Sequence, residues 1–194
     1  MLLLIAGLVL FLGVHSTRIF AEGWRDATIA RIGPMPWKGI YSVVSLVGFV
    51  VLIWGFRAAR ADTLVLWSPP FWARHVAGLL MMVSFVLLAA AYVPHNSIKA
   101  RLHHPMILGV KVWALAHLIA NNTLADVMLF GGFLAWAVLD FGSARKRDRA
   151  GHTVVPAGRA SRTALAVAIG VLAWAVFAFW LHRVLIGVAP MRVV

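Results

Sequence analysis

The sequence predicts an all-α integral membrane protein, a bundle of about six transmembrane helices that forms a single domain over residues 1–194. Hydrophobic residues make up 62% of the chain and the mean hydropathy is +0.90, whereas a soluble domain is closer to half apolar. Such a chain would expose large apolar patches in water, so a lipid bilayer is the expected partner of its surface.

Apolar runs occur along the whole length of the chain. Because a bilayer core requires about 20 residues of helix, the first and fourth runs are somewhat short or partly interfacial. The six runs expected to cross the membrane cover residues 2–19, 40–56, 76–93, 105–120, 124–141 and 164–188.

The segments between the runs contain typical helix boundaries. Gly33-Pro34 should interrupt the chain before the second run, and Pro105 suits the first turn of the fourth. Thr123 and Asp126 have the spacing of a capping box, which predicts a structural role for Asp126 at the start of the fifth run.

The basic residues indicate an orientation in the membrane. The chain has 18 Lys+Arg and 6 Asp+Glu, a formal net charge of +12. Twelve of the basic residues fall in the first, third and fifth connections and five on the other side, while Lys111 lies within a run. The positive-inside rule then predicts a multi-pass inner-membrane protein with both termini in the periplasm. The basic residues are explained as anchors, so no nucleic-acid partner is expected.

The residue inventory excludes some chemistry. The chain has no cysteine, which removes disulfides, thiolate nucleophiles and thiolate metal ligands. The chain has eight histidines. Most of them are expected in loops or at helix ends, where an imidazole is easily solvated: His75, His95, His103, His152 and His182.

His15 and His117 differ from the others because both lie inside apolar runs, where polar side chains are usually partnered or functional. Counted along their helices, they lie about 10 and 18 Å from the cytoplasmic face of a core about 30 Å thick. Two histidines on neighbouring helices can hold one metal ion, and imidazole suits haem iron. The alternative is two unrelated histidines, each bonded to a backbone carbonyl.

Two basic residues lie near these histidines in sequence. Arg18 follows His15 by three residues and should share its helix face, where it could bind a haem propionate or reach the lipid headgroups. Lys111 lies toward the cytoplasmic end of the fourth run and has the same two interpretations.

His104 opens the fourth run, where it could cap the helix. The spacing of His104, Pro105 and Gly109 also resembles a motif of membrane methyltransferases that act on prenylcysteine or phospholipid. Those enzymes usually have Arg before the His and Tyr two residues after the Pro, where this chain has His103 and Ile107. They also use acidic residues near the C-terminus, and the chain has none after Asp148.

Three segments together resemble the NnrU family: residues 12–18 around His15, residues 104–106, and residues 113–121 around His117, followed by Leu129-Phe130-Gly131-Gly132-Phe133. NnrU proteins are associated with denitrification, in nitrite and nitric oxide metabolism, and are similar to zeta-carotene isomerase, an integral membrane enzyme with haem b. The resemblance implies haem b as cofactor and His15 and His117 as iron ligands, with Arg18, Lys111 and His104 as further cofactor-binding candidates. The isomerase has a cysteine three residues before its second histidine, and here that position is Ala114.

These observations lead to one principal function and two alternatives. The principal one is a haem-b membrane protein with a redox or isomerase-like role, linked to nitrogen-oxide metabolism and acting on a hydrophobic or small redox-active substrate. The first alternative is a non-enzymatic membrane sensor or assembly factor. The second is a membrane methyltransferase.

Overall fold

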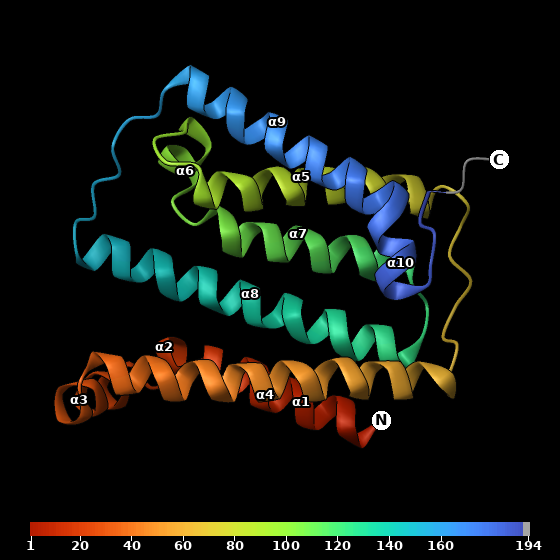
Figure 1. Ribbon diagram of the computed structural model, residues 1–194, viewed down its shortest axis with the longest axis horizontal. Helices are drawn as coiled ribbons and strands as arrows, with labels where there is room; N and C mark the ends of the chain where they lie inside the picture. The colour runs from red at the N-terminus through yellow and green to blue at the C-terminus, as the bar shows by residue number, and fades with distance from the viewer. Residues whose placement is uncertain (192–194) are drawn as a thin grey trace. The chain divides into compact units, whose positions relative to one another are not determined.

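The computed structural model describes residues 1–191 and is helical throughout its regular elements (Figure 1). Within these residues, Val65 and Thr123 form an isolated antiparallel β-bridge. The elements are α1 (Leu2–His15), α2 (Thr17–Phe20), α3 (Glu22–Ile32), α4 (Pro34–Ala61), α5 (Ala73–Tyr92), α6 (Ser97–Leu102), α7 (Pro105–Ala120), α8 (Leu124–Ala150), α9 (Ala160–Val176), the π-helical turn η1 (Phe177–Leu181) and α10 (His182–Ile186).

Four helical stretches among the described residues are long and apolar enough to cross a membrane, which confirms the all-α membrane class. They are α4, α5, α8 and the continuous stretch Ala160–Ile186. The first and fourth predicted runs form two shorter apolar helices, α1 with 14 residues and α7 with 16. At 1.5 Å per residue these two helices are about 21 and 24 Å long, shorter than a bilayer core of about 30 Å.

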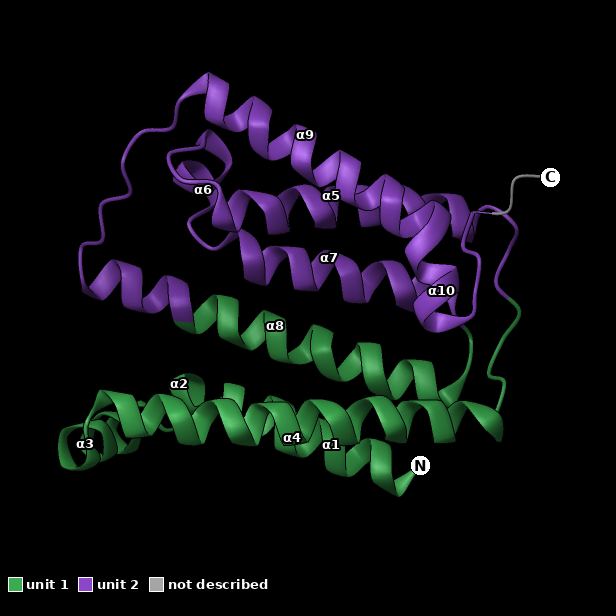
Figure 2. Ribbon diagram, viewed as in Figure 1, with its two compact units in different colours: residues 1–68, 122–143 green, residues 69–121, 144–194 purple. Residues whose placement is uncertain are grey.

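The chain divides into two compact units (Figure 2). Unit 1 contains Met1–Ser68 and Asn122–Ser143, so it holds α1 to α4 and most of α8. Unit 2 contains Pro69–Asn121 and the described part of Ala144–Val194, so it holds α5, α6, α7, α9, η1 and α10. Each unit is therefore built from segments that are far apart in the sequence.

In unit 1, α1 packs against α4 at backbone distance. Gly7 faces Leu52, and a Cβ atom added at Gly7 would lie 2.5 Å from the Leu52 Cα. A Cβ at Gly55 would likewise lie 2.5 Å from the Leu4 nitrogen. Glycine at these crossings lets two helices approach closely, which is the usual device of helix pairs in membranes.

The first run is interrupted earlier than its apolar length predicts. Helix α1 ends at His15, and the next residues form the separate turn α2. Ser16 Oγ donates to the Leu12 carbonyl at 2.6 Å and Thr17 Oγ1 donates to the Val14 carbonyl at 2.9 Å. Such hydroxyl bonds to the preceding turn compete with helix propagation. The connection expected after the first run contains helix α3. This helix ends at Ile32, and its C-cap residue Gly33 has φ 89°, as the Gly-Pro sequence predicts for this boundary.

In unit 2, α5 packs against both α7 and α9. The fully buried Ser84 on α5 donates from Oγ to the Gly109 carbonyl of α7 at 2.8 Å. On the other side, a Cβ at Gly170 of α9 would lie 2.5 Å from the Val86 Cα. Asn96 caps α6 by accepting from the Lys99 amide at 2.8 Å and is itself buried.

Two further boundaries bear on the sequence predictions. The capping box is confirmed: Thr123 Oγ1 accepts from the Asp126 amide and an Asp126 carboxylate oxygen accepts from the Thr123 amide, both at 3.2 Å. The last run, expected as one helix, instead changes from α9 to the π-helical η1 before α10 ends at Gly187, where φ is 81°.

Candidate functional site

His15 is the last residue of α1 and lies among aromatic rings of unit 1. Its Nδ1 donates to the Phe11 carbonyl one turn earlier, at 2.6 Å. The imidazole centroid lies 4.3 Å from the Phe11 ring, 5.3 Å from Tyr41 and 6.1 Å from Trp136. Since a carbonyl only accepts hydrogen bonds, Nδ1 carries the proton and the lone pair of the neutral ring is on Nε2.

Arg18, expected on the same helix face as His15, lies in α2, after the interruption at Ser16. Its guanidinium lies 3.5 Å from the Glu22 carboxylate, and its side chain is 52% exposed. The cation therefore has a neighbouring carboxylate of its own and remains accessible at the surface.

His117 lies in the last turn of α7, in unit 2, and repeats the arrangement at His15. Its Nδ1 donates to the Trp113 carbonyl at 2.9 Å, four residues earlier, and its ring lies 5.3 Å from the Trp113 ring. As at His15, this bond leaves the lone pair of the neutral imidazole ring on Nε2. Asn121 follows and donates from Nδ2 to the His117 carbonyl at 3.0 Å, which closes the end of the helix.

Two other residues of α7 concern the predicted cofactor site. Lys111 is half-buried at mid-helix, six residues before His117 and so about 9 Å away along the axis. Ala114 is fully buried. A larger side chain at position 114 would therefore have to be accommodated inside the packing of unit 2.

His104 occupies the N-cap position of α7, but its side chain makes no capping bond. Instead, Nε2 donates to the Asp148 carboxylate at 2.9 Å, and the same oxygen lies 3.3 Å from His103 Nδ1 and 3.5 Å from Arg145 Nη1. His104 thus joins the start of α7 to the charged end of α8. It lies 13 residues from His117, about 20 Å along the helix, so the structure does not bring these two predicted residues together.

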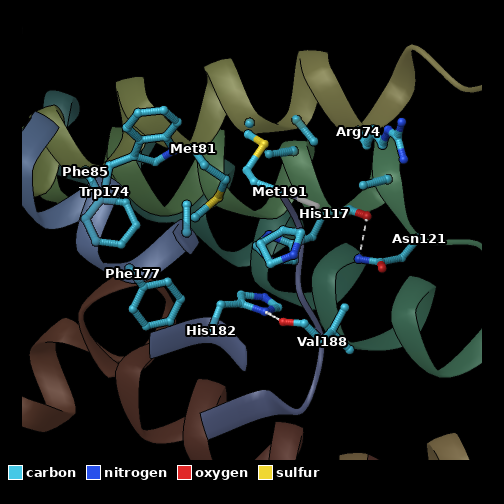
Figure 3. Close-up of a pocket in the computed structure, with 16 residues that line it drawn as sticks. Arg74, Met81, Phe85, His117, Asn121, Trp174, Phe177, His182, Val188 and Met191 are labelled. Atoms are coloured by element: carbon cyan, nitrogen blue, oxygen red, sulfur yellow. Dashed lines mark hydrogen bonds between the residues drawn. The ribbon is translucent and has the colours of Figure 1, made fainter. Parts of the chain in front are cut away.

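His117 also lines a cavity of about 200 Å³ within unit 2, which we call the His117 pocket (Figure 3). Its walls come from α5, α7, α9, η1, α10 and the segment that follows α10. Besides His117, the lining includes Arg74, Met81, Phe85, Asn121, Trp174, Phe177, His182 and Met191.

The sequence did not indicate His182 or Trp174 as site residues. His182, expected at a helix end where an imidazole is easily solvated, lines the His117 pocket, and its Nδ1 donates to the Val188 carbonyl at 2.7 Å (Figure 3). The available sequence signal was weak, because Trp174 and His182 are eight positions apart and would stand about 80° apart around a regular α-helix. The π-helical turn between them changes that relation.

No group of three or more His, Asp or Glu side chains that could hold a metal ion occurs within residues 1–191. The His103, His104 and Asp148 cluster is accordingly a hydrogen-bonded junction between α7 and α8. His15 and His117, which belong to different units, each offer a single imidazole in an apolar and aromatic setting.

The four long apolar stretches define the class, a multi-helix membrane protein, and the two shorter apolar helices α1 and α7 carry His15 and His117 in their last turns. Its family follows from comparison with known proteins. The family described as NnrU protein matches residues 3–190, so the chain belongs to the NnrU family. No curated protein and no solved structure matches the chain.

Proposed function

We propose that this NnrU-family membrane protein binds haem b through His15 and His117 and has a redox or isomerase-like role in nitrogen-oxide metabolism. The observation that carries the proposal is the arrangement common to the two histidines. Each has an aromatic residue four positions earlier, and each donates from Nδ1 to that residue's carbonyl, at 2.6 Å for His15 and 2.9 Å for His117. Each histidine has this arrangement within its own unit.

The donor chemistry of these residues fits haem iron. Metal-ligating histidines commonly donate their second ring N–H to a carbonyl, which fixes the tautomer and raises the basicity of the ligating nitrogen. Neutral imidazole is also a common axial ligand of haem. The His117 pocket, at about 200 Å³, is smaller than the roughly 300–1,000 Å³ of sites for drug-sized ligands. The proposal therefore depends on the two imidazoles and does not place haem inside that pocket.

The residues around the histidines limit the chemistry. When bound, haem would supply one-electron redox chemistry, and ligation by two imidazoles leaves no open position on the iron. The chain has no cysteine, and Ala114 is fully buried, so it offers no thiolate to exchange with His117. Arg18 and Lys111 are the cations proposed to balance the propionates, and His104, paired with Asp148, supports the far end of α7.

An absorption spectrum tests this proposal. Protein expressed with ample haem should show a Soret band and a low-spin spectrum. Either His15→Ala or His117→Ala should produce a high-spin spectrum or loss of haem, because one strong-field ligand is removed. Arg18→Ala should weaken haem retention and leave the ligand set intact, because it removes a charge-assisted contact and no iron bond.

Matched controls are His75→Ala and His152→Ala, which should leave the spectrum unchanged. A wild-type protein without a Soret band would reject haem binding and favour the non-enzymatic sensor or assembly factor. A band that is unaffected by both His15→Ala and His117→Ala would reject these two ligands.

The second part of the proposal is the topology. We propose that α1 and α7 add two short spans to the four long ones, giving six spans in the inner membrane with both termini in the periplasm. The support is the charge distribution: Arg145, Lys146, Arg147 and Arg149 follow the apolar part of α8 directly. A reporter fused after Arg149 should be cytoplasmic, and a periplasmic signal would reverse the orientation.

A further inference from the structure

The net charge of the chain is concentrated in the sequence of unit 2. The residues assigned to this unit include 12 Lys+Arg and one acidic residue, whereas those of unit 1 include six Lys+Arg and five acidic residues. The one acidic residue, Asp148, is already engaged by His104 at 2.9 Å and by Arg145 at 3.5 Å. Unit 2 therefore supplies almost no counter-charge of its own, and anionic groups from its surroundings are needed to balance it.

Two of the cations of unit 2 stand at the first residues of α9. Arg159 is the N-cap residue of this helix, and Arg162 lies in its first turn. Both residues are exposed, and no ion pair within residues 1–191 includes either arginine. Exposed guanidinium groups bind phosphate and carboxylate groups through directional, charge-assisted hydrogen bonds, so this pair can attract and hold an anion.

Helix α6 adds two more cations beside the start of α9. The Ser97 amide at the beginning of α6 donates to Thr163 Oγ1 at 2.8 Å, and Figure 1 shows α6 next to the first turns of α9. Lys99 donates from Nζ to the Ala91 carbonyl at 3.0 Å, which leaves further donors on its ammonium group, and Arg101 is exposed. We call these four cations of α6 and α9 the basic end of unit 2.

A groove of about 650 Å³ begins at the basic end and continues along α9. The residues that line it are Ser97 of α6 and, on α9, Ala160, Thr163, Ala164, Val167, Ala168 and Val171. The α9 positions recur every three or four residues, so they share one face of the helix, and beyond the hydroxyls of Ser97 and Thr163 the lining is apolar. From Ala160 to Val171 the helix rises about 17 Å, close to the thickness of one leaflet in a bilayer core of about 30 Å. The groove therefore has the length of one acyl chain.

We propose that this groove binds one anionic phospholipid, with an acyl chain along α9 and the phosphate group beside Arg159 and Arg162. Charge and polarity change along the groove as they do along a phospholipid, from cations at one end to apolar side chains at the other. Basic pockets at the ends of membrane helices are typical sites for anionic head groups. A zwitterionic head group carries its own cation and cannot supply the missing counter-charge. The proposal goes beyond haem binding, since it uses neither His15 nor His117.

A second copy of the chain is the other candidate for this groove. Small residues at four-residue spacing, here Ala160, Ala164 and Ala168, can also pack against another membrane helix. Two copies with the same orientation in the membrane would place their basic ends in the same leaflet, so paired α9 helices would bring like charges together. An anionic lipid brings the opposite charge to the same place, so charge complementarity favours the lipid.

Native mass spectrometry of the full chain in detergent tests the proposal with two probes that have the same palmitoyl and oleoyl chains, phosphatidylglycerol and phosphatidylcholine. The anionic phosphatidylglycerol should bind saturably as one adduct, and more tightly than phosphatidylcholine. Arg159→Gln combined with Arg162→Gln should weaken phosphatidylglycerol binding about tenfold to thirtyfold, at about fivefold per cation, with little effect on phosphatidylcholine. Ala164→Leu places a larger side chain in the groove and should weaken the binding of both lipids about threefold to tenfold.

The matched controls are Arg57→Gln combined with Arg60→Gln, which removes two exposed cations of α4, and Ala173→Leu, which enlarges an exposed residue of α9 outside the groove. Neither should alter phosphatidylglycerol binding. Equal affinity of the wild type for the two lipids, or equal losses in the control and groove variants, would overturn the proposal. A wild-type dimer that Ala164→Leu converts to a monomer would also overturn it, because a second copy would then occupy the groove. The absorption spectrum of the same samples reports separately on haem.

Discussion

The two units hold their apolar helices together in different ways. In unit 1, α1 and α4 meet backbone to backbone at Gly7 and Gly55. Unit 2 has comparable backbone approaches, at Gly170 and at Gly158 before α9, and adds a buried side-chain hydrogen bond from Ser84 to Gly109. Glycine lets two helices approach to backbone contact, and a buried side-chain hydrogen bond fixes which residues of two helices meet.

Two similar histidines have different surroundings in the two units. The local arrangement is the same, since both bond to the carbonyl four residues earlier. His15, however, is surrounded by the rings of Phe11, Tyr41 and Trp136, while His117 lines a cavity of about 200 Å³. A helical motif can therefore orient an imidazole, but the packing of its unit determines what can reach it.

The largest effect on this comparison is expected from Gly55→Ala. The new Cβ would lie 2.5 Å from the Leu4 nitrogen, so α1 must move away from α4. We expect a loss of about 1–3 kcal/mol in unfolding free energy, the range of overpacked sites, measured by thermal or denaturant unfolding in detergent. Such a shift would also disturb the rings around His15.

Gly39→Ala is the matched control because Gly39 lies in the same helix with no atom within 4 Å of an added Cβ. It should be neutral or stabilising by up to about 1 kcal/mol, since alanine favours the helix more than glycine does. If both variants had equal stability, the close α1–α4 contact would not be the feature that holds unit 1 together.

A smaller effect is expected from Ser84→Ala in unit 2. The change removes the hydrogen bond from Ser84 to the Gly109 carbonyl, but that carbonyl still accepts within α7 and is not left unpaired. The expected loss of unfolding free energy is therefore about 0.5–1.5 kcal/mol. Thr28→Ala in unit 1 is the control, because its hydroxyl is exposed and bonds to the Trp24 carbonyl of its own helix. Unfolding in detergent should show a lower stability for Ser84→Ala than for the control. If Ser84→Ala were as stable as the wild type, the bond from Ser84 to Gly109 would not contribute to holding unit 2 together.

Much of the local structure could be predicted from the sequence. The start and end of α7 at Pro105 and Ala120 agree with the predicted run, and the Thr123–Asp126 capping box formed as its spacing indicated. The boundary at Gly33 was also clear. These features depend on residues within one or two turns of each other, so their physical causes are contained in a short window of sequence.

Other features escaped prediction because neighbouring residues override the average pattern. The apolar run at the N-terminus suggested one helix to residue 19, but hydroxyl bonds from Ser16 and Thr17 accompany its end at His15. Arg18 consequently lies in another helix and pairs with Glu22. Hydropathy alone does not register this local competition for backbone carbonyls.

The sequence by itself determined that this chain is helical, that its helices are apolar enough for a membrane, and that His15 and His117 lie within them. Only the tertiary structure decided that His104 bonds to Asp148, 44 residues away, and that Trp174 and His182 share the His117 pocket. The physical reason is that composition and helical period set where a side chain stands on its own helix. Which side chains meet depends on helix packing and on the register change at Phe177–Leu181, and neither follows from a local pattern.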